Sequence, residues 1–220
     1  MMEEHVVIAI DGPAASGKST VARTLAKKLH YRYVNSGAMY RAVTWLAVSR
    51  GIPPGDAERI LELLQSVKLK CGFAGGEGTI LIDGVDPSPH LTDEAVNAGV
   101  SSIARIPKVR RLLVGKQRMC AKGRNVVMEG RDIGSAVFPD TPYKFYIDAT
   151  LDVRAARRAK QGLTDTIAAR DQQDSSRPTS PLVIAEDAHV VDSSHLTIDG
   201  VVGEIIGRLK LKGLALPEGI

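Results

Sequence analysis

Residues 12–19 form a short glycine-rich segment, Gly-Pro-Ala-Ala-Ser-Gly-Lys-Ser, that fits the pattern G-x-x-x-x-G-K-[ST]. It follows the largely apolar run 5–10, so a buried strand is predicted to lead through a glycine turn into a helix. In that setting successive backbone N–H groups point at one anion, and the helix N-terminus adds its partial positive charge. The chain is therefore predicted to bind a nucleoside triphosphate.

Two side chains of this segment carry specific chemistry. Lys18 can reach the β- and γ-phosphates, and the Ser19 hydroxyl can bind Mg²⁺. A carboxylate, Asp11 or Glu129, could hold the same ion through water. The residues expected to contact ATP are Gly12, Pro13, Ala14, Ala15, Ser16, Gly17, Lys18, Ser19 and Thr20.

Length and composition limit the class of protein. The 220 residues, 44% of them hydrophobic, can bury one good core with room for a small insert. No apolar run approaches the ~20 residues of a membrane span, and the start of the chain resembles neither a signal nor a transit peptide. Cys71 and Cys120 make no metal-binding spacing with each other or with a histidine. We expect a cytoplasmic protein with reduced thiols and no membrane partner.

The charge balance favours small anionic ligands over nucleic acid. Lys plus Arg number 29 and Asp plus Glu 25, which gives a net charge of +4. The densest basic stretch, residues 105–124, contains no aromatic residue and therefore no stacking platform for single strands. Most of these charges are interpreted as a solvated helix face, with Arg110 as the exception.

Short apolar runs alternate with amphipathic segments, which predicts an α/β fold: a five-stranded parallel sheet with helices on both faces. The predicted strands are 6–10, 31–34, 125–128, 144–147 and 189–191. Pro107 can open a helix whose apolar residues face inward. Those residues are Val109, Leu112, Leu113, Met119 and Cys120.

Two stretches interrupt the alternation within the single domain 1–220. Residues 67–71 and 79–83 resemble the strands of a hairpin, so 66–97 is predicted to be a small inserted subdomain. Residues 152–177 are polar and arginine-rich, with too few apolar residues for a core position. We interpret them as a mobile helical lid over the phosphates.

The remaining charged residues indicate what accepts the phosphoryl group. Arg41 follows the second strand, and Arg131 and Asp132 follow the third, so all three should lie at the ligand-binding carboxyl edge of the sheet. Several arginines converging there match an acceptor that is itself a phosphate. Further arginines come from the 107–110 segment and from the lid. These are Arg110, Arg154, Arg157, Arg158, Arg170 and Arg177.

A phosphate acceptor already carries an anionic oxygen near neutral pH and needs no general base. Catalysis would then rest on alignment, Mg²⁺ and cationic neutralisation of charge. A hydroxyl acceptor would need a nearby carboxylate, for which Asp11, Glu129 and Asp132 are candidates, so a shikimate- or gluconate-type kinase stays open. A third alternative is a non-catalytic nucleotide or RNA binder with salt-dependent affinity.

The chain resembles the bacterial cytidylate kinases, which are nucleoside monophosphate kinases, nearly from end to end. The resemblance is carried by residues 8–13, 36–41, 130–134 with 137–140, 170–174 with Arg177 and 181–182, and 192–194. It implies a phosphate-loop kinase fold with a monophosphate-binding insert, and transfer of phosphate from Mg–ATP to CMP or dCMP. It also implies small-molecule partners only. We expect a monomer, because domain closure needs free surfaces.

Site roles follow from the same resemblance. Arg41 and Arg131 would hold the acceptor phosphate, and Ser36 would line its pocket. Arg157 or Arg158 would close on the transferring phosphate. Ser101, Arg110 and Asp132 would meet the cytosine, and Arg170 and Asp174 the sugar, with Arg177 in support. The catalytic residues are thus expected to be Lys18, Arg131, Arg157 and Arg158.

The base chemistry agrees with one of these roles. Cytosine offers an amino donor at N4, whereas uracil offers an acceptor at O4. A carboxylate at Asp132 would accept from the first and repel the second, so CMP should be preferred over UMP. Two departures from the family pattern are Asn35, where an acid is usual, and the short segment between Arg158 and Arg170. The second predicts a small lid.

Overall fold

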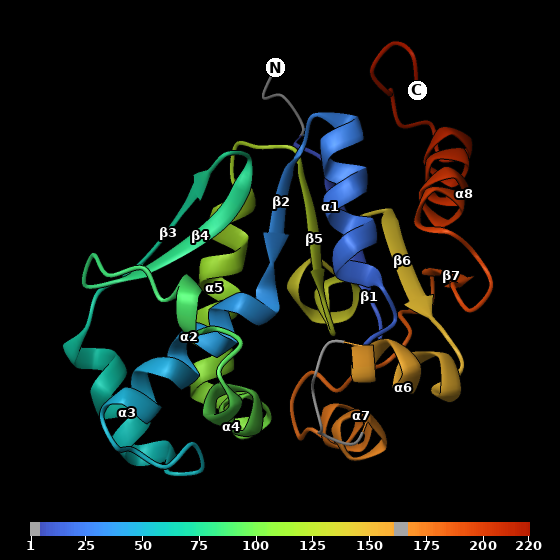
Figure 1. Ribbon diagram of the computed structural model, residues 1–220. Coiled ribbons are helices and arrows are strands. Elements are labelled where there is room, and N and C mark those ends of the chain that lie inside the picture. The colour runs from blue at the N-terminus through green and yellow to red at the C-terminus, as the bar shows by residue number, and fades with distance from the viewer. Residues whose placement is uncertain (1–4, 161–166) are drawn as a thin grey trace. The chain divides into compact units, whose positions relative to one another are not determined.

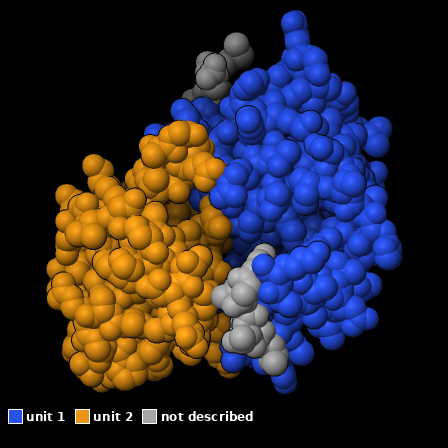
Figure 2. Space-filling view, in the orientation of Figure 1, with its two compact units in different colours: residues 1–34, 121–220 blue, residues 35–120 orange. Residues whose placement is uncertain are grey.

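The computed structural model describes residues 5–160 and 167–220, which form two compact units. Unit 1 comprises residues 1–34 and 121–220, and unit 2 comprises residues 35–120 (Figure 2). The glycine-rich segment, the third predicted strand and the lid residues belong to unit 1. The predicted hairpin and the basic stretch up to Cys120 belong to unit 2.

Unit 1 is built on five strands in the order β2-β5-β1-β6-β7 (Figure 1). They are β1 Val7–Asp11, β2 Arg32–Asn35, β5 Val126–Gly130, β6 Tyr143–Asp148 and β7 His189–Asp192. β1 pairs in parallel with β5 and β6, and β6 pairs in parallel with β7. These strands lie within two residues of the predicted ones, which confirms the α/β class. The described residues hold seven strands in all, because the hairpin in unit 2 adds two to the predicted five.

The core of unit 1 lies between this sheet and two helices, α1 Lys18–Leu29 and α8 Ile198–Leu211 (Figure 1). Apolar residues of α1 recur every four positions, at Val21, Leu25 and Leu29, and are fully buried against the strands. Ile205 and Leu209 of α8 are buried in the same cluster. This packing fixes the start of α1 at the carboxyl end of β1, where the glycine-rich loop joins them.

The predicted lid residues form two helices of unit 1, α6 Leu151–Lys160 and α7 Ile167–Ser175. Residues 161–166 of that prediction lie outside the described residues. The buried positions on these helices are mainly charged: Arg154, Arg158, Arg170 and Asp174, with Ile167 as the apolar one. Charged side chains at buried positions need hydrogen-bonding or oppositely charged partners.

Unit 2 contains four α-helices and the hairpin. They are α2 Ser36–Ser49, α3 Ala57–Ser66, β3 Leu69–Ala74, β4 Glu77–Ile82, α4 Glu94–Arg105 and α5 Pro107–Ala121, with a short 3₁₀ turn at Ser88–His90. β3 and β4 pair antiparallel from Leu69–Ile82 to Ala74–Glu77. Gly75 and Gly76 both have positive φ, 57° and 90°, as a two-residue hairpin turn requires.

The predicted inner face of α5 is partly wrong. Val109, Leu113 and Cys120 are buried, but Leu112 is 36% exposed and Met119 is 66% exposed. The buried stripe instead includes Gln117, which is 1% exposed, and follows a spacing of four, four and three residues. Leu112 and Met119 are seven positions apart and share a neighbouring, exposed stripe. Within the described residues, no helix is long and apolar enough to cross a membrane.

Candidate active site

The phosphate loop is the turn between β1 and α1, and its backbone needs glycine at two positions. Gly12 has φ 154°, and a Cβ there would lie 2.1 Å from the Ile147 carbonyl oxygen. Gly17 caps α1 in the left-handed region with φ 89°, but has space around it. Ala15 also has a positive φ of 58°, an uncommon state for a residue with a Cβ. The loop is therefore a strained turn ending at a helix N-terminus.

Lys18 is buried in this loop and lacks sufficient counter-charge. Its ammonium group donates to the Pro13 carbonyl oxygen at 2.8 Å, and the residue is 5% exposed. Burial, reinforced by the nearby Arg131 guanidinium, lowers the pKa of Lys18 to about 7, although Glu129 and Asp174 oppose the shift. Arg170 also lowers it. A site that crowds cations around a buried ammonium is suited to a multiply charged anion.

Asp174 lies between two arginines. Arg131 Nε donates to Asp174 Oδ2 at 2.7 Å, and Arg177 donates to Asp174 Oδ1. Burial alone would raise the pKa of Asp174, but Arg131 and Arg177 hold it below its usual range. Arg170 lies one turn before Asp174 on α7 and is also buried. Four residues predicted to bind the acceptor thus form one charged group in unit 1.

Arginines of α6 contact the phosphate loop itself. Arg154 forms an ion pair with Asp171 and donates to the Ala14 carbonyl oxygen at 3.4 Å. Asp171 Oδ1 in turn accepts from the Ala14 N–H at 3.4 Å. The Ala14 N–H and carbonyl groups are therefore both bound by the Arg154–Asp171 pair. The sequence analysis did not assign Asp171 a role, although it adjoins Arg170.

Arg157 also binds loop backbone. Its guanidinium donates to the Ser16 carbonyl oxygen at 3.2 Å and to the Ser193 hydroxyl and carbonyl oxygens at 3.0 and 2.7 Å. The Ser193 hydroxyl donates to the same Ser16 oxygen at 2.8 Å. Ser193, which follows β7, was also missed, because nothing local marks a serine that bonds across 177 positions. Arg158 is buried on the same helix.

Asp11, Glu129 and Asp132, the three carboxylates considered as general bases, differ in their partners. Asp11 accepts the Ile133 and Gly134 N–H groups, one on each oxygen, at 2.8 and 2.7 Å. Burial raises the pKa of Asp11 to about 7 against the effect of these donors. Glu129, at the end of β5, accepts from the Tyr33 hydroxyl at 3.1 Å. Asp132 is buried and precedes the π-helical turn η2, Ile133–Val137.

These oxygens are the hard ligands that Mg²⁺ prefers. The described residues contain no cluster of three or more His, Cys, Asp or Glu side chains that could enclose a metal. Ser19 on α1 and Glu129 are donors of the right type for such a site.

The other predicted acceptor residues lie in unit 2. Ser36, Ser101 and Arg110 are buried, on α2, α4 and α5, whereas Arg41 on α2 is half-buried. Arg110 donates to the Ala104 carbonyl oxygen at 3.1 Å, and its guanidinium carbon lies 5.4 Å from the Tyr40 ring centroid.

Asn35 gives a local explanation for one departure from the family pattern. Its side-chain oxygen accepts from the Ala38 N–H at 3.0 Å and caps α2. Asn caps a helix about as well as Asp, so the change removes a charge without removing the cap.

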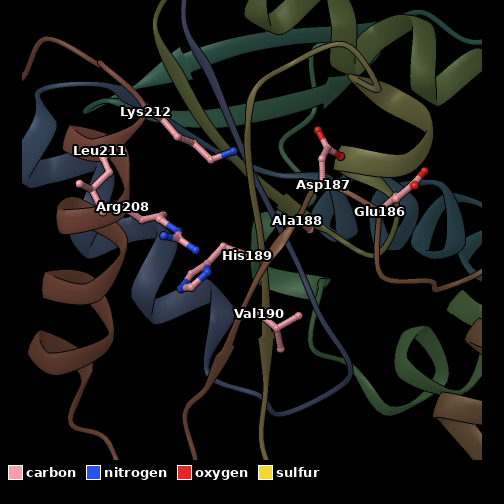
Figure 3. A pocket seen from close by; sticks show the side chains of 8 residues that line it. All are labelled: Glu186, Asp187, Ala188, His189, Val190, Arg208, Leu211 and Lys212. Carbon is pink, nitrogen blue, oxygen red and sulfur yellow. The ribbon is translucent and has the colours of Figure 1, made fainter.

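A separate pocket of about 350 Å³ in unit 1 holds none of the predicted site residues (Figure 3). It is lined by Glu186, Asp187, Ala188, His189, Val190, Arg208, Leu211 and Lys212. Three of its polar side chains contact protein groups: Asp187 pairs with Lys144, His189 contacts Glu204, and Lys212 donates to the Pro142 carbonyl oxygen. We assign the function to the phosphate-loop region instead.

The parallel sheet, the strained loop and the buried lysine define a phosphate-loop kinase. The family model described as cytidylate kinase matches residues 8–211. A cytidylate kinase from Desulforamulus reducens is 44% identical over 216 residues, which cover 93% of this chain and 97% of that protein. One from Caldanaerobacter subterraneus is 42% identical over 221 residues, which cover 96% and 97%. The chain belongs to the cytidylate kinase family.

One more curated relative and one solved structure show how far the similarity extends. A bifunctional pantoate ligase/cytidylate kinase from Synechococcus is 42% identical over 223 residues, but the chain spans only 44% of that protein's length. The structure of shikimate kinase from Acinetobacter baumannii in complex with shikimate superposes with a TM-score of 0.50 at 13% identity. It covers 97% of this chain and 98% of that one, and supports the fold alone.

Proposed function

We propose that the protein transfers the γ-phosphoryl group of ATP to CMP or dCMP, giving CDP or dCDP. The observation that carries the proposal is the buried Lys18, whose pKa falls to about 7 among Arg131 and Arg170. A nucleotide phosphate would supply the negative charge that this cluster lacks. Membership in the cytidylate kinase family names the acceptor class.

The loop would bind the donor phosphates through its N–H groups and the start of α1. Lys18 would contact the β- and γ-phosphates, and Arg154 and Arg157 would keep the loop backbone in its strained form through Ala14 and Ser16. Arg157 or Arg158 would also serve the transferring phosphate. Mg²⁺, held by Ser19 with Glu129 or Asp11 behind water, would neutralise phosphate charge when bound.

The acceptor would be oriented by the residues that the family resemblance assigns to it. Arg131 and Arg41 would bind its phosphate, and Ser36 would line the pocket. Arg170, Asp174 and Arg177 would bind and support the sugar, and Ser101, Arg110 and Asp132 the base. Because the attacking phosphate oxygen is already anionic, no residue needs to remove a proton. The two hydrogen bonds on Asp11 accordingly support a positioning role for it.

Residues 66–97 would act as the monophosphate-binding insert and 152–177 as the lid. We further propose a cytoplasmic enzyme that works as a monomer. Light scattering coupled to size-exclusion chromatography tests the last point, and a dimer mass at micromolar concentration would contradict it.

The decisive experiment is a coupled ADP-release assay with Mg–ATP against CMP, dCMP, UMP, AMP and shikimate. Fast turnover with CMP and dCMP, lost when EDTA removes Mg²⁺, is the expected result. Turnover with shikimate alone would keep the fold and overturn the acceptor. Salt-dependent RNA binding without turnover of any acceptor would overturn the enzyme assignment.

Asp132 provides a test of base recognition. We expect Asp132→Asn to narrow the CMP/UMP ratio of kcat/KM by about 10- to 100-fold, because an amide can donate to the uracil O4. The measurement is kcat/KM for both acceptors in the wild type and in Asp132→Asn. An equal loss for CMP and UMP would show that Asp132 does not read the base.

A further inference from the structure

The two cysteines of the chain meet inside unit 2. Cys71 lies on β3 and is half-buried, and Cys120 lies in the last turn of α5 and is 5% exposed. Both are free thiols, and their side chains are hydrogen-bonded to each other. They are 49 positions apart, so only the packing of the hairpin against α5 brings them together.

A second contact runs beside the first and fixes the same register. Lys116 Nζ donates to the Leu69 carbonyl oxygen at 2.9 Å, again joining α5 to β3. Leu69 precedes Cys71 by two residues, about 6.7 Å along a strand. Lys116 precedes Cys120 by four residues, about 6 Å along a helix. The spacing between the two contacts is therefore nearly the same along the strand and along the helix, so both contacts fit one packing of β3 against α5.

The surroundings also favour reaction at Cys71. The hydrogen bond with Cys120 and the charge of Lys116 lower the pKa of the Cys71 thiol, although burial opposes them. A thiolate is the reactive form of cysteine, and its formation beside a second thiol is typical of cysteines that oxidise reversibly. Cys71 is also the more exposed of the two and hence the first that an oxidant would reach.

We propose that Cys71 and Cys120 form a peroxide-responsive dithiol that closes to a disulfide between β3 and α5. The Cys71 sulfur attacks one oxygen of hydrogen peroxide, the O–O bond breaks, and hydroxide leaves to take up the proton released by Cys71. The Cys120 sulfur then attacks the resulting sulfenic acid at sulfur. The S–S bond forms, the S–O bond breaks, and water leaves with the Cys120 proton. Two thiols are oxidised, and one peroxide is reduced to two waters.

The disulfide would close a loop of ~50 residues and restrict the unfolded chain of unit 2. It would also tie α5, which carries Arg110, to the hairpin. The oxidised protein should therefore unfold at a higher temperature than the reduced one. A thiol reductant should reverse both the bond and the change in Tm.

The test uses the full chain, reduced, desalted and treated with an equimolar amount of hydrogen peroxide before alkylation with N-ethylmaleimide. We expect a monomer lighter than the reduced protein by two hydrogen atoms, without maleimide, and a Cys71–Cys120 peptide on digestion. Dithiothreitol should restore two maleimide additions. Two maleimides after peroxide, sulfinic acid at Cys71 or a disulfide-linked dimer would each overturn the proposal.

Matched variants assign the order of the steps. In Cys120→Ser, Cys71 should stop at sulfenic acid and be trapped by dimedone. In Cys71→Ser, Cys120 should stay reduced, because it is buried. Dimedone labelling of Cys120 instead would overturn the assigned order. The mass measurement on the wild type decides the disulfide itself, whether or not the variants fold.

Discussion

Unit 1 has two regions rich in charged residues. One is the phosphate-loop region, and the other is the separate pocket lined by residues of β7 and α8, here called the β7–α8 pocket. In the phosphate-loop region, Lys18 and Asp174 are 5% and 2% exposed and lie among other buried charged side chains. In the second, the side chains of Asp187 and Glu204 are 54% and 42% exposed. Both regions have many charges, but only the first has buried charges with pKa values moved to about 7. We infer from this difference that burial with incomplete neutralisation is a better guide to a binding site than charge density.

The largest expected difference in enzymatic activity is between alanine variants of two lysines, Lys18 and Lys212. Lys18→Ala should lower kcat by at least ~100-fold, because a cation on the transferring phosphates is lost. Lys212→Ala, in the pocket, should leave kcat/KM within about twofold. Steady-state assays with CMP measure both, with circular dichroism to confirm folding. An equal loss of activity in the two variants would remove the distinction between the regions.

Removing the carboxylate of Asp174 should lower the free energy of unfolding much more than removing that of Glu204. Asp174→Ala leaves the partly buried Arg131 and Arg177 without their shared, buried partner and should cost about 3 kcal/mol of the free energy of unfolding. Glu204→Ala removes a half-exposed partner of His189 and should cost no more than about 0.5 kcal/mol. Urea unfolding at pH 7 measures both. If Glu204→Ala cost as much as Asp174→Ala, exposure would not be what distinguishes the regions.

A smaller effect should appear in the pH dependence of ATP binding. With a pKa of about 7 in the free protein, Lys18 loses its proton above neutral pH, so ATP affinity should fall by up to about tenfold per pH unit. Calorimetry from pH 7 to 9 measures this fall. Lys18→Arg, whose guanidinium stays charged, is the matched control and should flatten the profile. Identical slopes in both proteins would show that another group titrates.

Lys18 also makes the free energy of unfolding depend on pH in the absence of nucleotide. Its pKa is lower in the folded protein than the value of 10.5 in the unfolded chain. Between pH 7 and 10.5 the unfolded chain therefore binds more protons, so the Lys18 contribution to the free energy of unfolding rises with pH. The unfavourable effect of burying this lysine is greatest below pH 7.

The strands of unit 1 were predictable because parallel strands buried on both faces are continuously apolar. The phosphate loop was predictable because its function requires a fixed local pattern. The inner face of α5 was harder, since Leu112 and Met119 form a second apolar stripe that only tertiary packing distinguishes from the first. Asp171 and Ser193 were beyond reach for a different reason. Both lie in segments that carry the family resemblance, but nothing local in the sequence shows that they bond to loop backbone 157 and 177 positions away.

Gly12 has a consequence for how this sequence can evolve. Every single-base change of a glycine codon that alters the amino acid adds at least a Cβ atom, and that atom would lie 2.1 Å from the Ile147 carbonyl oxygen. Every single-base substitution at Gly12 therefore creates a clash. A Cβ at Gly17 would instead make an ordinary contact of 3.7 Å with Arg157 Nη1, so the main obstacle there is the unfavourable φ. Any side chain at position 12 would therefore require the end of β6, which carries Ile147, or the loop itself to move.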